Sequence, residues 1–155
     1  MAAGTSLPSL FGRFTALSSE RGRLDVTLRC LDDLCTALAS ERAALGCDIY
    51  PLAVIADLLV DLSQHFAAEE RDAYFGTIVL EQPSLLPRVV ELKAEHDALL
   101  RTIAELGTIA ADDHRRSELL APALRMVARL QSHEHAESEL LQEYFLVSPP
   151  ERSRT

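Results

Sequence analysis

Residues 130–144 read LQSHEHAESELLQEY and place apolar and ionisable side chains on one face of a helix. That face follows steps of three and four residues, which is the spacing of an amphipathic helix. His133 and Glu137 therefore stand one turn apart on a face that should be buried. Burying an ionisable group is costly unless it is paired or bound to a metal, so the pair indicates a site inside the protein. The face is formed by Leu130, His133, Glu137, Leu140 and Tyr144.

Two further segments repeat this arrangement. His65 and Glu69 lie four residues apart on an apolar stripe that includes Leu58 and Leu62. His96 lies at the centre of another stripe, which is formed by Val89, Leu92, Leu99 and Ile103. Because side chains on one stripe point the same way, we expect all three segments to direct histidine or glutamate toward a common interior.

His135 and Glu139 share the four-residue spacing but not the apolar face. Their neighbours on the helix surface are largely polar, so we expect this pair to be solvated. Those neighbours are Ala128, Gln131, Ser138 and Gln142.

Apolar periodicity predicts four helices and no strand, because no stretch alternates apolar and polar residues with β-branched enrichment. Short connections between four helices favour an all-α, up-down-up-down four-helix bundle. We expect an N-terminal arm at residues 1–17, the bundle at 18–147 and a C-terminal tail at 148–155. The predicted helices run from about Ser18 to Gly46, from Asp48 to Gly76, from Val89 to Gly107 and from Leu120 to about Tyr144.

Composition limits the partners of this domain. Its 155 residues include 15 Lys and Arg against 24 Asp and Glu, for a formal net charge of -9. Such a negative field repels phosphate backbones and anionic lipid, so we expect neither a nucleic-acid nor a membrane partner. The three cysteines, Cys30, Cys35 and Cys47, cannot all pair internally, and the first residues do not resemble a secretory signal, which favours the cytoplasm. The oligomeric state stays open.

The ionisable residues on the three stripes are candidate metal ligands. Imidazole and carboxylate groups that converge in a helical bundle bind iron, manganese or zinc. The spacing differs from the His-Glu-x-x-His of zinc proteases and from the Glu-x-x-His of ferritin-like sites. Glu70 and Glu95 are adjacent in sequence to two of the candidates. The default interpretation is that both are exposed surface charges, and the alternative is that they hydrogen-bond to the ligands. The candidate ligands are His65, Glu69, His96, His133 and Glu137.

Three motifs occur in order along the chain, HFAAEE at 65–70, EHDAL at 95–99 and HEHAE at 133–137. Over about residues 18–146 they resemble the hemerythrin-like (HHE cation-binding) four-helix proteins. The resemblance implies a non-haem site for one or two iron ions, with manganese or zinc as alternatives, and a small ligand such as dioxygen, nitric oxide or iron itself. It also implies that Glu69 and Glu137 bridge two irons, that His96 and His133 ligate one, and that His65 ligates the other.

The chain departs from that family on its first helix, where Arg21 replaces the family's histidine. This departure predicts a reduced or asymmetric site. The alternative is a metal-free helical interaction module, because a guanidinium between Glu69 and Glu137 would neutralise both carboxylates without an ion. No residue specifies a substrate pocket, which argues against an enzyme, but the family resemblance leaves an enzymatic role such as peroxide reduction or metal-centre repair open.

Overall fold

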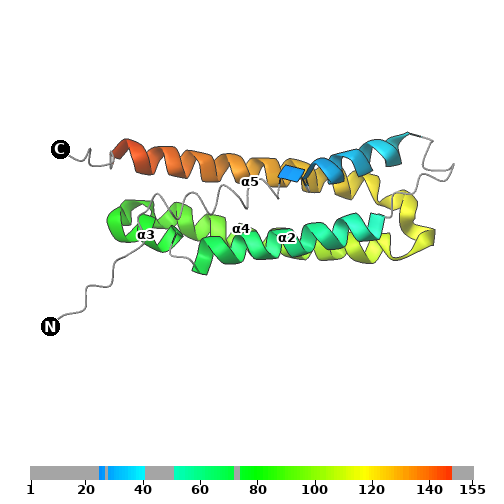
Figure 1. The fold of residues 1–155 in the computed structure, drawn as a ribbon, viewed down its shortest axis with the longest axis horizontal. Coiled ribbons are helices and arrows are strands. Elements are labelled where there is room, and N and C mark those ends of the chain that lie inside the picture. Colours follow the sequence, from blue (N-terminus) through cyan, green and yellow to red (C-terminus); the bar gives the residue numbers. More distant parts are fainter. Residues whose placement is uncertain (1–24, 27, 41–50, 72–73, 148–155) are drawn as a thin grey trace.

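The computed structural model describes residues 25–26, 28–40, 51–71 and 74–147. These residues are almost entirely helical and contain no strand, as the periodicity predicts (Figure 1). The predictions for the N-terminal arm, Arg21, Cys47 and the C-terminal tail lie outside the described residues.

Three long helices form the part of the fold that holds the candidate site. They are α2 (Pro51–Arg71), α4 (Leu86–Ala110) and α5 (Leu120–Val147). Helices α2 and α5 both pack against α4, which runs antiparallel to them (Figure 1). Shorter elements complete the path: helical residues 25–26 and 28–39, α3 (Tyr74–Glu81), and the 3-10 helices η2 (Pro83–Leu85) and η3 (Asp113–Glu118).

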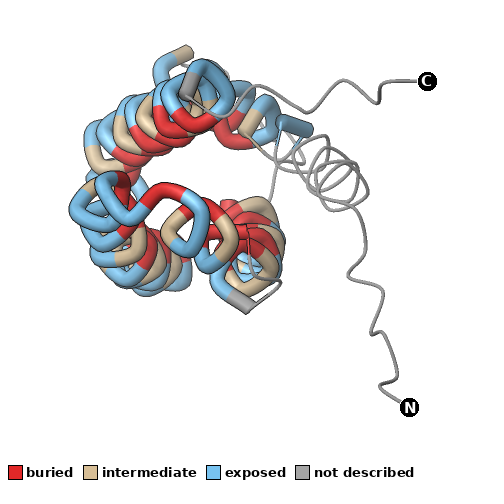
Figure 2. Tube along the Cα trace, turned by 90° about the vertical axis from the view of Figure 1, so that its left-hand side faces the viewer, coloured by how far each residue is buried: buried red, intermediate tan, exposed pale blue. Residues whose placement is uncertain are grey.

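The core of the described residues consists of two apolar clusters, and the buried residues lie on the inward faces of the helices (Figure 2). The first cluster includes Leu31, Leu58, Leu62, Leu99 and Leu130. The second cluster includes Tyr74, Phe75, Leu92, Leu140 and Tyr144. On α4, His96 falls between Leu92 of the second cluster and Leu99 of the first, so a polar layer separates the two clusters.

Helix α3 corrects the expected end of a helix at Gly76. The chain is helical from Tyr74 to Glu81, with Gly76 inside the helix. Tyr74, Phe75 and Ile78 are buried in the second cluster. Burying these three large side chains outweighs the cost of about 1 kcal/mol that glycine imposes on a helix.

Helix α4 also extends beyond its expected end at Gly107 and stops at Ala110. Leu106 and Ala110 continue the buried stripe at a step of four residues, so burial carries the helix past the glycine. The chain then turns at Asp112, whose side chain accepts a hydrogen bond from the backbone of His114 at 2.9 Å.

The segment Pro51–Glu81, which contains α2 and α3, is long and apolar enough to cross a membrane by length and composition alone. Core helices of soluble proteins pass the same test. Ile55, Leu58 and Leu62 of this stretch are buried in the first cluster, whereas Leu52, Val60 and Leu80 are exposed.

Leu58→Ala is expected to lower the free energy of unfolding of the metal-free protein by about 2–5 kcal/mol, because the side chain is fully buried. The matched control is Leu80→Ala, since Leu80 is 82% exposed and its truncation should cost less than about 0.5 kcal/mol. Urea titrations followed by circular dichroism measure both values. Equal losses in the two variants would contradict this description of the core.

Candidate metal centre

Four ionisable side chains from three helices meet in the polar layer. One ligand atom from each lies within 4.8 Å of the others, and all four residues are buried. Glu69 comes from α2, His96 from α4, and His133 and Glu137 from α5. The structure therefore brings together four of the five residues that the sequence nominated, and this group could hold a metal ion.

The Nε2 atoms of both histidines face carboxylate oxygens. His133 Nε2 lies 2.9 Å from Glu137 Oε1, and His96 Nε2 lies 3.8 Å from the same oxygen. His96 Nε2 also lies 3.4 Å from Glu69 Oε2. Two nitrogen donors and two carboxylates thus surround one small volume.

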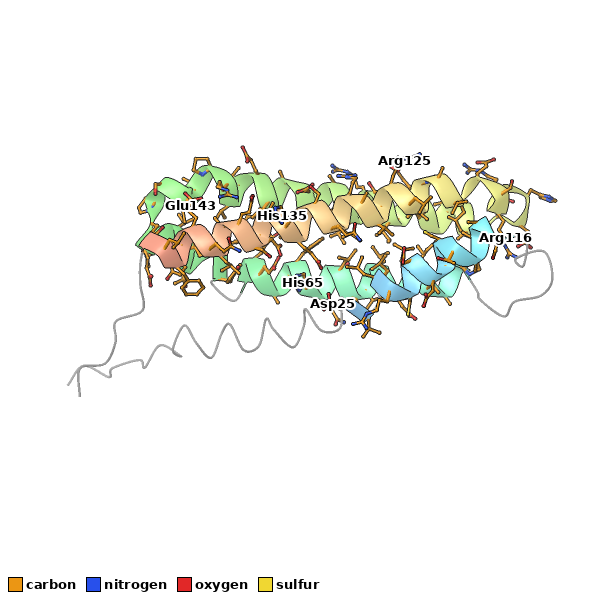
Figure 3. The ribbon with its side chains drawn as sticks, turned by 90° about the horizontal axis from the view of Figure 1, so that it is seen from above. Asp25, His65, Arg116, Arg125, His135 and Glu143 are labelled. Carbon is orange, nitrogen blue, oxygen red and sulfur yellow. The ribbon has the colours of Figure 1, made fainter. Side chains whose placement is uncertain are left out.

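His65 is buried beside this group without belonging to it (labelled in Figure 3). Its Nε2 atom lies 3.2 Å from Glu69 Oε1, whereas the other oxygen of Glu69 faces His96. Glu69 therefore stands between two histidines and presents one oxygen to each.

The ligand atoms of this group suit a metal ion because several of them are buried without a hydrogen bond. Three inward-facing atoms make no hydrogen bond of ordinary geometry to any residue that the structure describes: Glu69 Oε2, His96 Nε2 and His133 Nε2. A buried polar atom left in this state costs about 1–3 kcal/mol. A cation among these atoms would accept their lone pairs and remove that cost.

The two carboxylates respond differently to their surroundings. Burial raises the pKa of Glu69, and the nearby charge of Glu137 raises it further. Burial also acts to raise the pKa of Glu137, but contacts with His133 and His96 outweigh it and lower this pKa below the ordinary value. Because the ligand oxygens of these two buried carboxylates lie within 4.8 Å of each other, ionisation of only one of them is favoured. A bound divalent cation would allow both to ionise.

Aromatic side chains fix the two imidazole rings and separate them from water. The Phe66 ring stacks on His96 with centroids 3.9 Å apart and an interplanar angle of 4°. The Phe66 and His133 ring centroids lie 5.4 Å apart, with the two planes at 73°. Phe75 covers another part of His96, with centroids at 5.9 Å.

The outer nitrogens of the two histidines contact Glu70 and Glu95. His96 Nδ1 lies 2.8 Å from Glu70 Oε1, and His133 Nδ1 lies 3.0 Å from Glu95 Oε2. Burial acts to lower the pKa of His133, but its contacts with Glu137 and Glu95 outweigh that effect and raise it. The carboxylates of Glu70 and Glu95 are partly exposed, as the sequence predicts for surface charges. Each of them also contacts the outer nitrogen of a buried histidine. The available sequence signal was their position directly beside Glu69 and His96.

Other ionisable or reactive residues stay outside this group. His135 is 75% exposed, and its Nε2 atom lies 3.5 Å from Glu139 Oε1, which confirms the expected solvated pair. Cys35 is buried in the first apolar cluster, and burial raises the pKa of its thiol. The Tyr144 hydroxyl donates to Glu81, and burial together with this carboxylate raises the pKa of Tyr144 to about 12.

Comparison of the chain with protein-family models, with curated proteins and with solved structures found no match. The functional interpretation therefore rests on the site itself.

Proposed function

We propose that the protein is a hemerythrin-like, non-haem metal-binding protein that senses or handles a small ligand such as dioxygen, nitric oxide or iron itself. The observation that supports it most is the group of four buried ligand atoms within 4.8 Å of one another. The antiparallel course of α2, α4 and α5 supports the up-down-up-down bundle that this family implies (Figure 1).

The resemblance to the hemerythrin-like family favours iron as the metal, and the ligand chemistry admits manganese and zinc as alternatives. Imidazole nitrogen and carboxylate oxygen suit all three ions. His96, His133 and Glu137 would hold one ion firmly, and Glu69 would add its Oε2 atom. The Oε1 atom of Glu69, next to His65, would serve a weaker second position.

When bound, iron supplies a Lewis-acidic, redox-active centre at which a small ligand can exchange. Residues of the chain would exclude water from that centre and neutralise its positive charge. Phe66 packs against both imidazoles, and the carboxylates of Glu69 and Glu137 would neutralise a bound divalent ion. The site also joins two helices across the core, since Glu69 belongs to α2 and Glu137 to α5. A change of charge between these carboxylates would therefore alter how strongly α2 and α5 are held together.

The test adds iron(II) anaerobically to metal-free protein, removes unbound ion by gel filtration, and follows the optical spectrum as nitric oxide or dioxygen is admitted. We expect retained iron and a spectral change with at least one of the two gases. Retention without any response would contradict the sensing of these gases. If no iron is retained by a fully helical protein, the metal-free interaction module becomes the better account.

A further inference from the structure

Each of the two histidines that share the metal candidate has a carboxylate at its outer nitrogen. His96 Nδ1 contacts Glu70 at 2.8 Å and His133 Nδ1 contacts Glu95 at 3.0 Å. The imidazoles themselves are buried, whereas the outer carboxylates reach the surface. The geometry therefore occurs twice, with the same ring nitrogen on the outside in both cases.

An ionised carboxylate can only accept a hydrogen bond, so each Nδ1 atom must carry the donated proton. The Nε2 atom is then left to face the interior, where it can offer its lone pair to an ion. A ligating histidine held in this way has a fixed ring orientation and a more basic metal-facing nitrogen.

The outer carboxylates also connect the three helices in sequence. Glu70 follows the candidate ligand Glu69 on α2 and reaches His96 on α4. Glu95 precedes His96 on α4 and reaches His133 on α5. Helices α2 and α4 thus each supply one candidate ligand and, from the adjacent residue, a carboxylate that contacts a ligand on the next helix.

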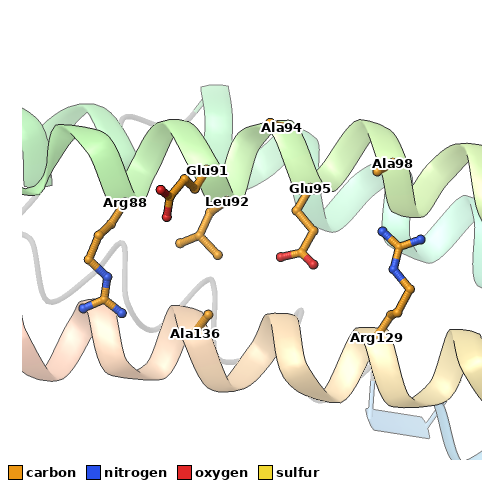
Figure 4. A pocket seen from close by; sticks show the side chains of 8 residues that line it. All are labelled: Arg88, Glu91, Leu92, Ala94, Glu95, Ala98, Arg129 and Ala136. Carbon is orange, nitrogen blue, oxygen red and sulfur yellow. The ribbon is translucent and has the colours of Figure 1, made fainter.

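Glu95 occupies a distinct position, because it lines a surface cavity of about 400 Å³ between α4 and α5 (Figure 4). Figure 4 shows its carboxylate directed from α4 toward α5, with Glu91 one turn away on the same wall. Glu91 lines the same cavity and contacts no histidine in the described part of the chain. It is therefore a matched control for the charge of Glu95.

We propose that Glu70 and Glu95 are positioning residues that hold His96 and His133 with Nδ1 protonated and Nε2 directed at the metal. The proposal rests on the proposed metal-binding function and adds two residues to it. Glu70 and Glu95 contact the outer nitrogens of the histidines, so they would act on the metal through these histidines and not as ligands themselves.

The first measurement uses isotope-labelled, metal-free protein, so it does not depend on metal. Nuclear magnetic resonance should detect hydrogen-bonded Nδ1 protons on His96 and His133. Glu95→Ala should remove the His133 signal and leave that of His96, and Glu70→Ala should do the reverse. An unprotonated Nδ1 atom on either histidine of the wild type would overturn the proposal.

The second measurement is the zinc affinity of the same variants, determined by competition with a chromophoric chelator. Glu95→Ala should weaken zinc binding about 10- to 100-fold. Glu95→Gln keeps an acceptor oxygen without the charge, so it should recover part of that loss. Glu91→Gln should bind zinc as the wild type does.

Equal zinc affinity in Glu95→Ala and Glu91→Gln would overturn the positioning role and leave the metal-binding function intact. Failure of the proposed function would look different, because the wild type would then take up no zinc although both Nδ1 protons were hydrogen-bonded. That second result would also overturn the role of these carboxylates in holding metal ligands.

Discussion

His133→Ala is expected to weaken metal binding by more than about 100-fold, beyond the loss expected for an outer hydrogen-bond partner. His133 is buried, and its Nε2 atom lies 2.9 Å from Glu137 in the group of four candidate ligands. Alanine supplies no donor atom at this position, and the rest of the group retains only one imidazole. The measurement is equilibrium binding of zinc or iron(II) to the purified variant.

His135→Ala is the matched control for this prediction. His135 lies two residues away on the same helix and has its own glutamate four residues on, but it is 75% exposed (labelled in Figure 3). Its removal should leave the metal affinity unchanged. Comparable losses in the two variants would mean that binding occurs at the protein surface and not in the core.

Removing metal from the loaded protein is expected to lower its thermal stability by about 8–16 °C. An ion at 1,000 times its dissociation constant adds about 4 kcal/mol to the free energy of unfolding, and in a chain of this size 1 kcal/mol corresponds to about 2–4 °C. The physical cause is that Glu69 Oε2, His96 Nε2 and His133 Nε2 make no hydrogen bond of ordinary geometry to the described residues, and a bound ion would accept their lone pairs. Thermal unfolding followed by circular dichroism, with and without a chelator, measures the shift.

The same experiment on His133→Ala separates specific from general effects of metal. This variant should show at most about one third of the wild-type shift, because a 100-fold weaker affinity leaves the ion at about ten times its dissociation constant. A shift as large as that of the wild type would contradict the assignment of the stabilising ion to this site.

The periodic faces of α2, α4 and α5 could be predicted from the sequence because each carries apolar residues at helical steps. The polar exceptions on those faces, among them His65, His96 and Glu137, could be predicted for the same reason, and all three are buried. A stripe shows which way a side chain points, so the convergence of the candidate ligands followed once the helices were packed together.

The helix ends and the outer contacts could not be predicted in the same way. Gly76 and Gly107 look like helix ends locally, but the buried residues beyond them continue the helices. The hydrogen bonds of Glu70 and Glu95 depend on the relative rotation of neighbouring helices, which the spacing within one helix does not contain. The place of Arg21 lies outside the described residues, so the choice between one ion and two stays a prediction.

The most direct test is the metal content per chain of wild-type protein expressed in iron-supplemented medium, determined by mass spectrometry after gel filtration. We predict one firmly retained iron, with a second position that is partly filled or empty, and loss of the metal in His133→Ala but not in His135→Ala. A fully helical wild-type protein that retains no metal would contradict the account, and the function would then lie on the surface of the bundle.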